Sequence, residues 1–471
     1  MGIKRYVASA DTTISNAFRS NLKTRMTGAN MGASDILEIF SIYAQSSSNS
    51  SELSRVLINF PVSDIRTDRT AGNIPGSGSV TFYMRLFNAP HGETLPRNFS
   101  LIAQPVSRSF EEGTGLDMEE GTDITRNETG ANWVFAASGT QWTTGGGDFY
   151  SSSYTQSFVG GIEDFELDVS PLVENWLNST TPSNGVGIFL SGSNESENRS
   201  YYTKKFFARS SEFFFKRPII EARWDSSTKD DRMRFYLSSS LLNSTDNAHT
   251  IYLYNYFTGS LKNIASIGTG AIYVQVYSSA SAGTLLTTTP SVVTGGYYTT
   301  GTYSASFALS TTASICYDRW FSGAVGFYTG TIKPISFPVY DYHLSSRKYV
   351  SSIPNLKPVY SSNESAKMRV FVREKNWNPN IYTVSTATPE GTVIDNAFFK
   401  VVRLADNLET IGYGTASTNH TKLSYDAQGN FFNIDMSLFE TGYAYGIKFM
   451  YLLDGLYEEQ AETFKFRMKD I

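Results

Sequence analysis

The side chains best suited to acid–base or metal chemistry are few and widely separated in this sequence. None of the four histidines lies in a His-x-His or His-Glu-x-x-His spacing: they are His91, His249, His343 and His420. Folding could bring some of them together as metal ligands or as a catalytic base. The missing spacing favours the simpler interpretation, that they are ordinary loop residues. The single cysteine, Cys316, excludes an internal disulfide and a cysteine-rich metal site. From the histidine spacing and this cysteine count together, we predict no catalytic residue, no metal and no cofactor.

One segment is rich in carboxylates and glycines. Its acidic residues are Glu111, Glu112, Asp117, Glu119, Glu120 and Asp123. Oxygen-rich loops with glycines can hold Ca²⁺, but the spacing here does not follow a DxDxDG pattern. The pattern favours a solvated loop, or a face that meets a basic partner subunit. A pair of glycosidase carboxylates could also be hidden in this segment, and the sequence gives no separation to test.

Aromatic residues offer a second kind of chemistry, which is stacking on sugar rings. Trp133 and Trp142 flank Phe135, and Trp377 lies much farther along the chain. If exposed, these rings predict a contact with a glycan or another partner. The alternative is core packing and loop anchoring in a sandwich without disulfides, and the pattern around Trp133 and Trp142 favours it.

A tyrosine-rich stretch is the better candidate for partner binding. Strand alternation places Tyr252, Tyr254 and Tyr256 on one face and Leu253, Asn255 and Phe257 on the other. Both faces are apolar enough to be largely buried. We therefore expect one of them to pack against another subunit.

Composition indicates what must position these residues. Aromatic residues make up 14% of the 471-residue chain, and Ser, Thr and Gly are abundant, as suits strands and turns. Charged residues reach only 18%, below the roughly 25% of typical globular chains. The net charge of −5 and the absence of a basic run argue against nucleic-acid binding. No stretch approaches the ~20 apolar residues of a membrane span, and the start of the chain does not resemble a secretory signal peptide.

Short alternating runs in the first part predict strands. They are Ile36–Tyr43, Arg55–Phe60, Val80–Phe87 and Gly185–Leu190. Residues Asp168–Leu177 form the best helix candidate, since Asp168 or Ser170 can cap it and Pro171 suits its first turn. The apolar run Phe213–Lys216 predicts a core strand or an interface edge. A polar linker, Asp225–Asp231, ends this part.

Two further parts follow the linker, and their alternating runs also predict strands. In the second part these are Met233–Leu237, Ile251–Phe257, Ile272–Tyr277, Ser304–Leu309 and Ala324–Thr329. In the third they are Lys367–Arg373, Phe398–Leu404, Phe431–Met436, Ala444–Tyr451 and Glu462–Arg467. We therefore predict an all-β chain of three tandem sandwiches at 1–225, 232–350 and 366–471, the last two Ig-like.

Several segments of the first part occur in the order known from one family. They are Ser9–Ile14, Leu53–Phe60, Asn132–Trp133 with Trp142–Gly147, Asp168–Leu177 with Ser183–Gly187, and Phe206–Arg209 with Arg217–Trp224. Residues 1–225 thereby resemble the DNRLRE-type β-sandwich module of surface and phage structural proteins. That resemblance implies a jelly-roll-type sandwich. Secreted members of the family carry signal peptides, and this sequence departs from them at that point. The whole chain resembles the virion structural proteins of tailed phages of the cyanophage type.

These observations lead to a functional hypothesis. The chain is expected to be a non-enzymatic virion component of a tailed phage, located at the neck, tail, baseplate periphery or capsid surface and assembled in the host cytoplasm. Its partners would be other virion proteins, in a homo-oligomer or symmetric ring, without nucleic acid or membrane insertion. The alternative is an adhesin or tail-fibre protein that binds a host receptor or a host surface glycan. A polysaccharide-degrading enzyme is a third class, and it requires two carboxylates about 5–10 Å apart in a cleft.

Overall fold

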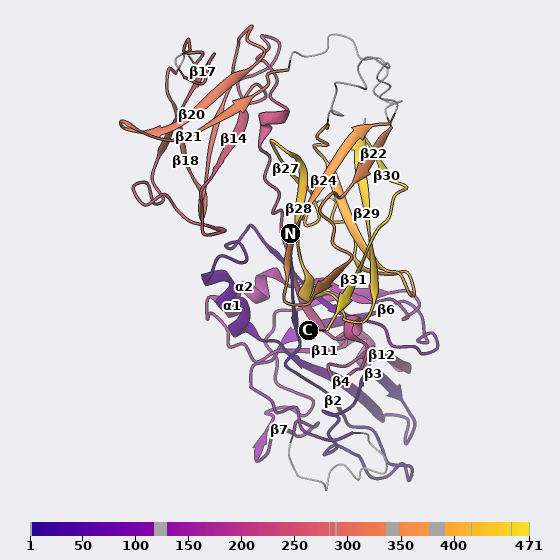
Figure 1. Cartoon of the computed structure of the whole chain (residues 1–471). Helices are drawn as coiled ribbons and strands as arrows, with labels where there is room; N and C mark the ends of the chain where they lie inside the picture. Colours follow the sequence, from indigo (N-terminus) through magenta and orange to yellow (C-terminus); the bar gives the residue numbers. More distant parts are fainter. Residues whose placement is uncertain are drawn as a thin grey trace. The chain divides into compact units, whose positions relative to one another are not determined.

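Strands make up nearly all of the regular structure (Figure 1). The computed structural model describes residues 2–116, 130–281, 283–287, 290–335, 348–375, 391–415, 417–453 and 455–470. No helix within these ranges is long and apolar enough to cross a membrane. The strands form several layered sheets, so the prediction of an all-β chain of multiple β-sandwiches is confirmed.

The chain divides into two compact units. The first consists mainly of residues 2–225, and the second mainly of residues 226–471. The finer division into domains at 1–225, 232–350 and 366–471 stays a prediction.

The first unit contains two main sheets and a small hairpin. One sheet has the order β1-β13-β5-β10, with bounds Ile3–Val7, Ile219–Arg223, Thr81–Leu86 and Phe165–Asp168. The other has the order β12-β3-β4-β11-β6-β9, with bounds Tyr201–Phe207, Ile36–Tyr43, Ser51–Asn59, Val186–Leu190, Phe99–Pro105 and Tyr154–Phe158. Strand β2 (Ala10–Ser15) also pairs with β4, and β7 (Phe135–Ala137) pairs with β8 (Thr140–Gln141).

The core of the first unit follows from alternation along its strands. In β5, Phe82, Met84 and Leu86 are buried, whereas the side chains between them face away from the core. Helix α2 (Ser170–Leu177) adds Trp176 to this core. Pro171 lies in the first turn of α2 as predicted. The predicted cap at Asp168 or Ser170 is wrong, because Val169 is the N-cap residue and no side chain caps the helix. Asp168 Oδ1 accepts a hydrogen bond from the Ser170 amide, at the helix start. The other short helices are α1 (Val62–Thr70), α3 (Gly192–Ser196) and the 3₁₀ turn η2 (Phe214–Lys216).

The prediction of a core strand at Phe213–Lys216 is wrong, and its alternative, an interface edge, stays a prediction. These residues form the single turn η2, in which the Lys216 amide donates to the Phe213 carbonyl. Phe213 and Phe214 are exposed, and their rings contact neighbouring aromatic side chains instead of the core. A run of three phenylalanines followed by a lysine has no period, so it does not distinguish a strand from a turn.

The second unit begins with a six-stranded sheet. Its order is β14-β19-β18-β17-β20-β21, with bounds His249–Tyr254, Thr302–Phe307, Val293–Thr299, Ile272–Tyr277, Cys316–Ser322 and Val325–Ile332. Strands β15 (Tyr256–Phe257) and β16 (Ser260–Leu261) form a hairpin directly after β14. The core beneath the sheet includes Trp320 and Phe235, both fully buried.

The prediction of a strand at Met233–Leu237 is also wrong. The 3₁₀ turn η3 (Asp231–Met233) occupies its beginning, and only an isolated bridge joins Tyr236 to Ile335. The turn forms because Arg232 is drawn inward. Its guanidinium pairs with Asp230, contacts Asp318 Oδ2 at 2.7 Å and donates to the Tyr252 carbonyl at 2.6 Å.

The remainder of the second unit forms two facing sheets. One has the order β22-β24-β28-β27, with bounds Tyr349–Ser352, Ser365–Glu374, Gly429–Asp435 and Ser424–Asp426. The other has the order β23-β31-β29-β25-β26, with bounds Val359–Ser361, Phe464–Lys469, Ala444–Leu453, Ala397–Arg403 and Leu408–Ile411. Strand β30 (Leu456–Glu459) pairs with β29, and the 3₁₀ turn η5 spans Met436–Leu438. Aromatic stacking joins the sheets, as between Phe399 and Phe432, whose ring centroids are 4.4 Å apart.

Candidate functional site

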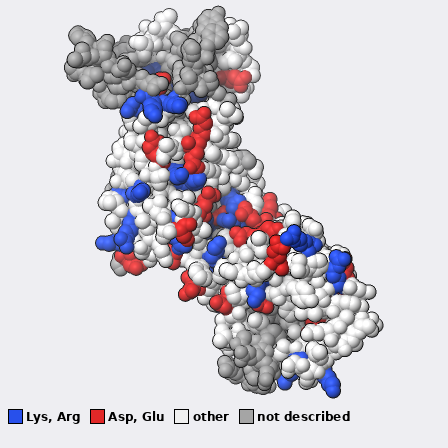
Figure 2. Space-filling model, turned by 90° about the vertical axis from the view of Figure 1, so that its right-hand side faces the viewer, with Lys and Arg blue, Asp and Glu red and all other residues white. Residues whose placement is uncertain are grey.

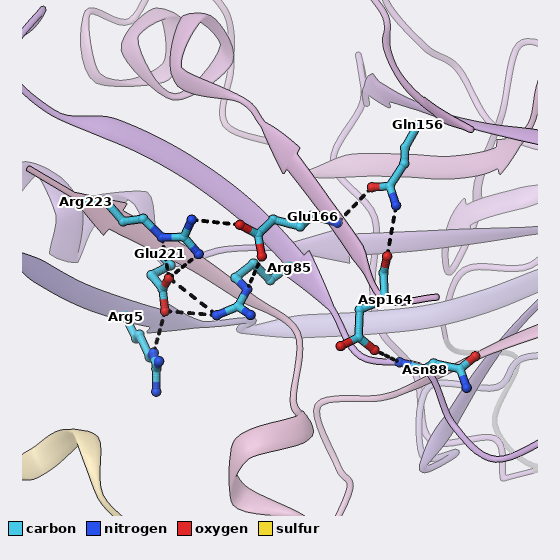
Figure 3. A network of polar contacts seen from close by, with 8 residues as sticks. All are labelled: Arg5, Arg85, Asn88, Gln156, Asp164, Glu166, Glu221 and Arg223. Atoms are coloured by element: carbon cyan, nitrogen blue, oxygen red, sulfur yellow. Dashed lines mark hydrogen bonds and ion pairs between the residues drawn. The ribbon is translucent and has the colours of Figure 1, made fainter. Parts of the chain in front are cut away.

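A cluster of charged side chains joins the strands of the four-stranded sheet in the first unit (Figure 3). Strands β1, β5 and β13 each contribute an arginine: Arg5, Arg85 and Arg223. All three contact Glu221, at 2.7 Å, 3.3 Å and 2.6 Å respectively. Glu166 of β10 extends the network to Arg223 at 2.7 Å and to Arg85 at 3.0 Å.

This network is a structural feature and offers no acid or base. Glu221 is 1% exposed. Burial alone would raise the pKa of its carboxyl, but Arg5, Arg85 and Arg223 together hold that pKa well below its ordinary value. Both carboxylate oxygens are occupied by guanidinium groups. The cluster therefore ties four strands together and leaves Glu221 ionised.

The side-chain amide of Gln156 bridges the edge strands of the two sheets of the first unit, β9 and β10 (Figure 3). Gln156 of β9 donates from Nε2 to the Asp164 carbonyl and accepts at Oε1 from the Glu166 amide. The Asp164 carboxylate in turn accepts a hydrogen bond from the backbone N–H of Asn88. Gln156 thus satisfies one backbone group of β10 and one just before it, which would otherwise be free to pair with another strand.

One residue of the acidic segment, Glu112, forms an ion pair. Glu112 forms two hydrogen bonds with Arg209, at 2.6 Å and 2.9 Å, and also accepts from the Asp11 amide. Asp117, Glu119, Glu120 and Asp123 lie outside the described residues. Asp11 is 1% exposed and accepts from the Arg209 amide. Burial raises the pKa of Asp11 to about 7, and the Glu112 charge adds to this effect.

The raised pKa of Asp11 predicts that the stability of the folded chain depends on pH. Because the folded pKa of this carboxyl lies above its unfolded value, the folded state holds the proton more tightly. The stabilisation is therefore complete below about pH 4 and is lost as the pH rises through about 7. Between pH 5 and 8 the free energy of unfolding of the wild type should fall by roughly 2–3 kcal/mol more than that of Asp11→Asn. The Asn side chain of this variant keeps an acceptor oxygen. Denaturation curves at several pH values measure this difference, and parallel pH profiles would contradict the assignment.

Trp133 and Trp142 belong to a packed cluster over the outer face of the seven-stranded sheet. Trp142 is 6% exposed, and its indole nitrogen donates to the Asn132 carbonyl. Its ring therefore has no free face for a sugar. Trp133 is half-buried against the same cluster, with the Arg55 guanidinium 5.4 Å from its ring. The packing interpretation accounts for both side chains. Trp377 lies outside the described residues.

The three predicted tyrosines do not share one strand. Tyr252 and Tyr254 lie on β14 with ring centroids 6.2 Å apart, and burial raises the pKa of both hydroxyls. Tyr256 belongs to the β15–β16 hairpin and is exposed. The expected single tyrosine face is interrupted at Asn255, where the strand ends and its amide donates to the Gly301 carbonyl. Whether these tyrosines contact a partner stays a prediction.

Next to these tyrosines the second unit contains a pocket of about 400 Å³. It is lined by Leu253, Tyr254, Asn255, Phe257, Lys262, Asn263, Ile264, Ala265, Phe327 and Tyr328. The end of β14, the hairpin β15–β16 with the residues after it, and the edge strand β21 supply these walls. None of the lining residues is acidic. The sequence pattern pointed to the β14 side, but it gave no signal that β21, about seventy residues later, forms the opposite wall.

A patch of exposed apolar side chains lies on the first unit. Leu95, Val159, Ile162 and Tyr202 are each more than half exposed. Backbone hydrogen bonds hold their segments side by side, because the Tyr202 amide donates to Leu95 and the Asn98 amide donates to Val159. We call these four side chains the apolar patch.

The loop that carries Val159 and Ile162 is fixed in place. Glu163 Oε1 accepts from the amides of Val159 and Gly160, both at 2.9 Å. These backbone donors hold the pKa of Glu163 below its ordinary value, although burial opposes them. The apolar patch therefore belongs to an ordered loop.

The three histidines that the structure describes, His91, His249 and His420, do not assemble into a metal site. No group of three or more His, Cys, Asp or Glu side chains positioned for a metal occurs among the residues that the structure describes. His91 has a lowered pKa because it is partly buried, and His249 packs its ring on Phe235 with centroids 4.7 Å apart. His343 lies outside the described residues.

Comparisons with known proteins give only distant likenesses. No protein-family model matches the chain, and no curated protein matches it. Among solved structures, the Yersinia pseudotuberculosis adhesin InvE matches at 14% identity and a TM-score of 0.15, over 46% of this chain and 54% of that one. Tandem Ig repeats of Dlar match at 8% identity and 0.13, over 43% and 84%, and a marsupial T cell receptor at 7% and 0.16, over 47% and 68%. The match spans about half of the adhesin.

Proposed function

We propose that this chain is a non-enzymatic structural component of a tailed-phage virion that contacts other virion proteins. The observation that carries this proposal is the apolar patch of Leu95, Val159, Ile162 and Tyr202. Exposed apolar side chains that gather at one place on a soluble protein mark a contact surface. In the assembled particle another virion protein covers the patch and removes it from water.

The order of the patch favours a preformed contact. Its segments are held by backbone hydrogen bonds and by the Glu163 carboxylate, so little conformational freedom is lost when a partner binds. A structural role needs only such complementary surfaces, of about 800 Å² per partner, without a nucleophile or a cofactor.

The general character of the surface also supports this proposal. On the face in Figure 2 most residues are uncharged, and the acidic and basic residues are interspersed without a large patch of one sign. Tandem β-sandwiches can act as spacers, as a bridging or fibre-like virion element requires. The segments that resemble a DNRLRE-type module point to the same class of protein.

Purified particles give the direct test. An antibody raised against the recombinant chain should detect it in particles banded on a density gradient from lysed cultures of its source. Labelling in electron micrographs should place it at a defined position on the particle. Detection only in the soluble lysate, with none in the particles, would refute a virion role.

The apolar patch provides a mutational prediction. The double variant Val159→Asp/Tyr202→Lys should fold normally, because both side chains are exposed, but its copy number in particles should fall at least tenfold. The control Tyr443→Lys changes an exposed tyrosine of the second unit and should leave incorporation unchanged. Quantitative immunoblots of particles measure the copy number, and normal incorporation of the double variant would exclude the patch as the contact.

A further inference from the structure

The pocket of the second unit has the chemistry of a carbohydrate site. We propose that it binds one sugar residue carrying a carboxylate, at the end of a surface polysaccharide or glycan. This inference does not depend on the virion role, because the purified chain would bind the sugar wherever it is located.

Two aromatic rings supply the apolar part of the site. Phe257 and Tyr328 are 61% and 46% exposed, and both line the pocket from different strands. An exposed ring presents a flat apolar face, which matches the C–H face of a pyranose. The pocket volume of about 400 Å³ accommodates one sugar ring with its substituents.

Two amide side chains supply the polar part. Asn255 donates from Nδ2 to the Lys262 carbonyl at 2.7 Å, and Asn263 Oδ1 accepts from the Gly301 amide at 2.7 Å. These bonds fix both side chains and leave Asn255 Oδ1 as an acceptor and Asn263 Nδ2 as a donor. A sugar hydroxyl can both donate and accept, so a pair of hydroxyl groups complements this arrangement.

The charge of the pocket selects an acidic sugar. Lys262 is its only charged lining residue, and none of the ion pairs among the described residues includes Lys262. Its ammonium group lies over the Phe257 ring, 5.0 Å from the ring centre, so the charge is held at the mouth of the pocket on one face of that ring. A carboxylate on the bound sugar can therefore pair with Lys262 while the sugar ring stacks on Tyr328.

A glycan array with the full-length chain tests the proposal. The array should carry glycans that end in uronic or sialic acids, together with their neutral counterparts as methyl esters. We expect binding to acidic glycans that weakens at least tenfold on esterification and falls when NaCl is raised to about 0.5 M. Equal binding to the esters, or no binding to any acidic glycan, would overturn the proposal.

Variants locate the site. Lys262→Ala and Tyr328→Ala should each weaken binding of the best array glycan about tenfold, measured by isothermal titration calorimetry. The matched controls are Lys23→Ala, an exposed lysine of the first unit, and Tyr457→Ala, a tyrosine of similar exposure. Both controls should bind like the wild type. Unchanged binding by Lys262→Ala and Tyr328→Ala would place the sugar elsewhere and refute this pocket.

Discussion

Replacing Arg232 by Met is expected to destabilise the second unit by about 3–5 kcal/mol. Arg232 is 5% exposed, and it lies between Asp230 and Asp318, which are also buried. Burial alone would lower the pKa of Arg232, but Asp318 and Asp230 hold it above its ordinary value, so the guanidinium stays charged. Its removal leaves two carboxylates in a buried position without a cation, and it also deprives the Tyr252 carbonyl of a donor.

Calorimetry of the full chain should show this as a lower unfolding temperature of one transition. Arg319→Met is the matched control, because Arg319 follows Asp318 directly but its side chain is exposed. That control should change stability by no more than about 0.5 kcal/mol. The triple variant Asp230→Asn/Arg232→Met/Asp318→Asn removes all three charges and should recover part of the loss. Equal stability of Arg232→Met and the wild type would show that the buried charges contribute nothing.

Replacing Glu221 by Gln is expected to destabilise the first unit by a similar amount, about 3–5 kcal/mol. The change removes the anion that Arg5, Arg85 and Arg223 share, and it leaves these three guanidinium groups close together. Glu166 remains as a carboxylate beside Arg85 and Arg223. Like-charge repulsion in a poorly hydrated place then acts against the four-stranded sheet. Denaturant titration of the purified chain measures the loss.

The acid dependence of this variant is a second readout. The folded pKa of Glu221 lies below its unfolded value, so its contribution is present above about pH 4.5 and is lost as the pH falls toward the folded pKa. The wild type should therefore lose stability on acidification, and Glu221→Gln should lose less. Glu93→Gln, which breaks the exposed pair with Arg97, should cost less than about 1 kcal/mol. A wild-type loss no larger than that of Glu221→Gln would contradict this account.

Strands with a clean alternation could be predicted from the sequence. Ile36–Tyr43 and Ile272–Tyr277 are strands with the predicted bounds, because every second side chain of each is buried. Helix α2 was also predictable, since Pro171 and an apolar stripe mark its first turn and buried face. In these elements the local pattern and the tertiary burial agree.

The failures have a common physical cause. Phe213–Lys216 and Met233–Leu237 were predicted as strands from their apolar residues, but both include residues of a 3₁₀ turn that the residue types do not reveal. Arg232 turns inward and pairs with Asp318, which lies 86 residues later in the chain. A local sequence pattern does not predict an ion pair between residues this far apart. The pocket proposed to bind a sugar could not be predicted from the sequence for a related reason. Its two walls come from β14 and β21, which are the first and last strands in the order of the six-stranded sheet. A sequence pattern detects a face of one strand, whereas a site of this kind depends on which strands become neighbours.

The pairing of β1 with β13 has a mechanical consequence. The two strands are antiparallel, and Ile3 lies opposite Arg223, so the chain enters and leaves the first unit at the same end of this pair. A pulling force applied between residues 2 and 224 would load the cross-strand hydrogen bonds one after another, beginning with the bond from the Trp224 amide to the Gly2 carbonyl. Bonds broken in sequence yield at a much lower force than bonds sheared together. Under tension the first unit should therefore open by unzipping, with the arginines around Glu221 as the next resistance after the terminal bonds.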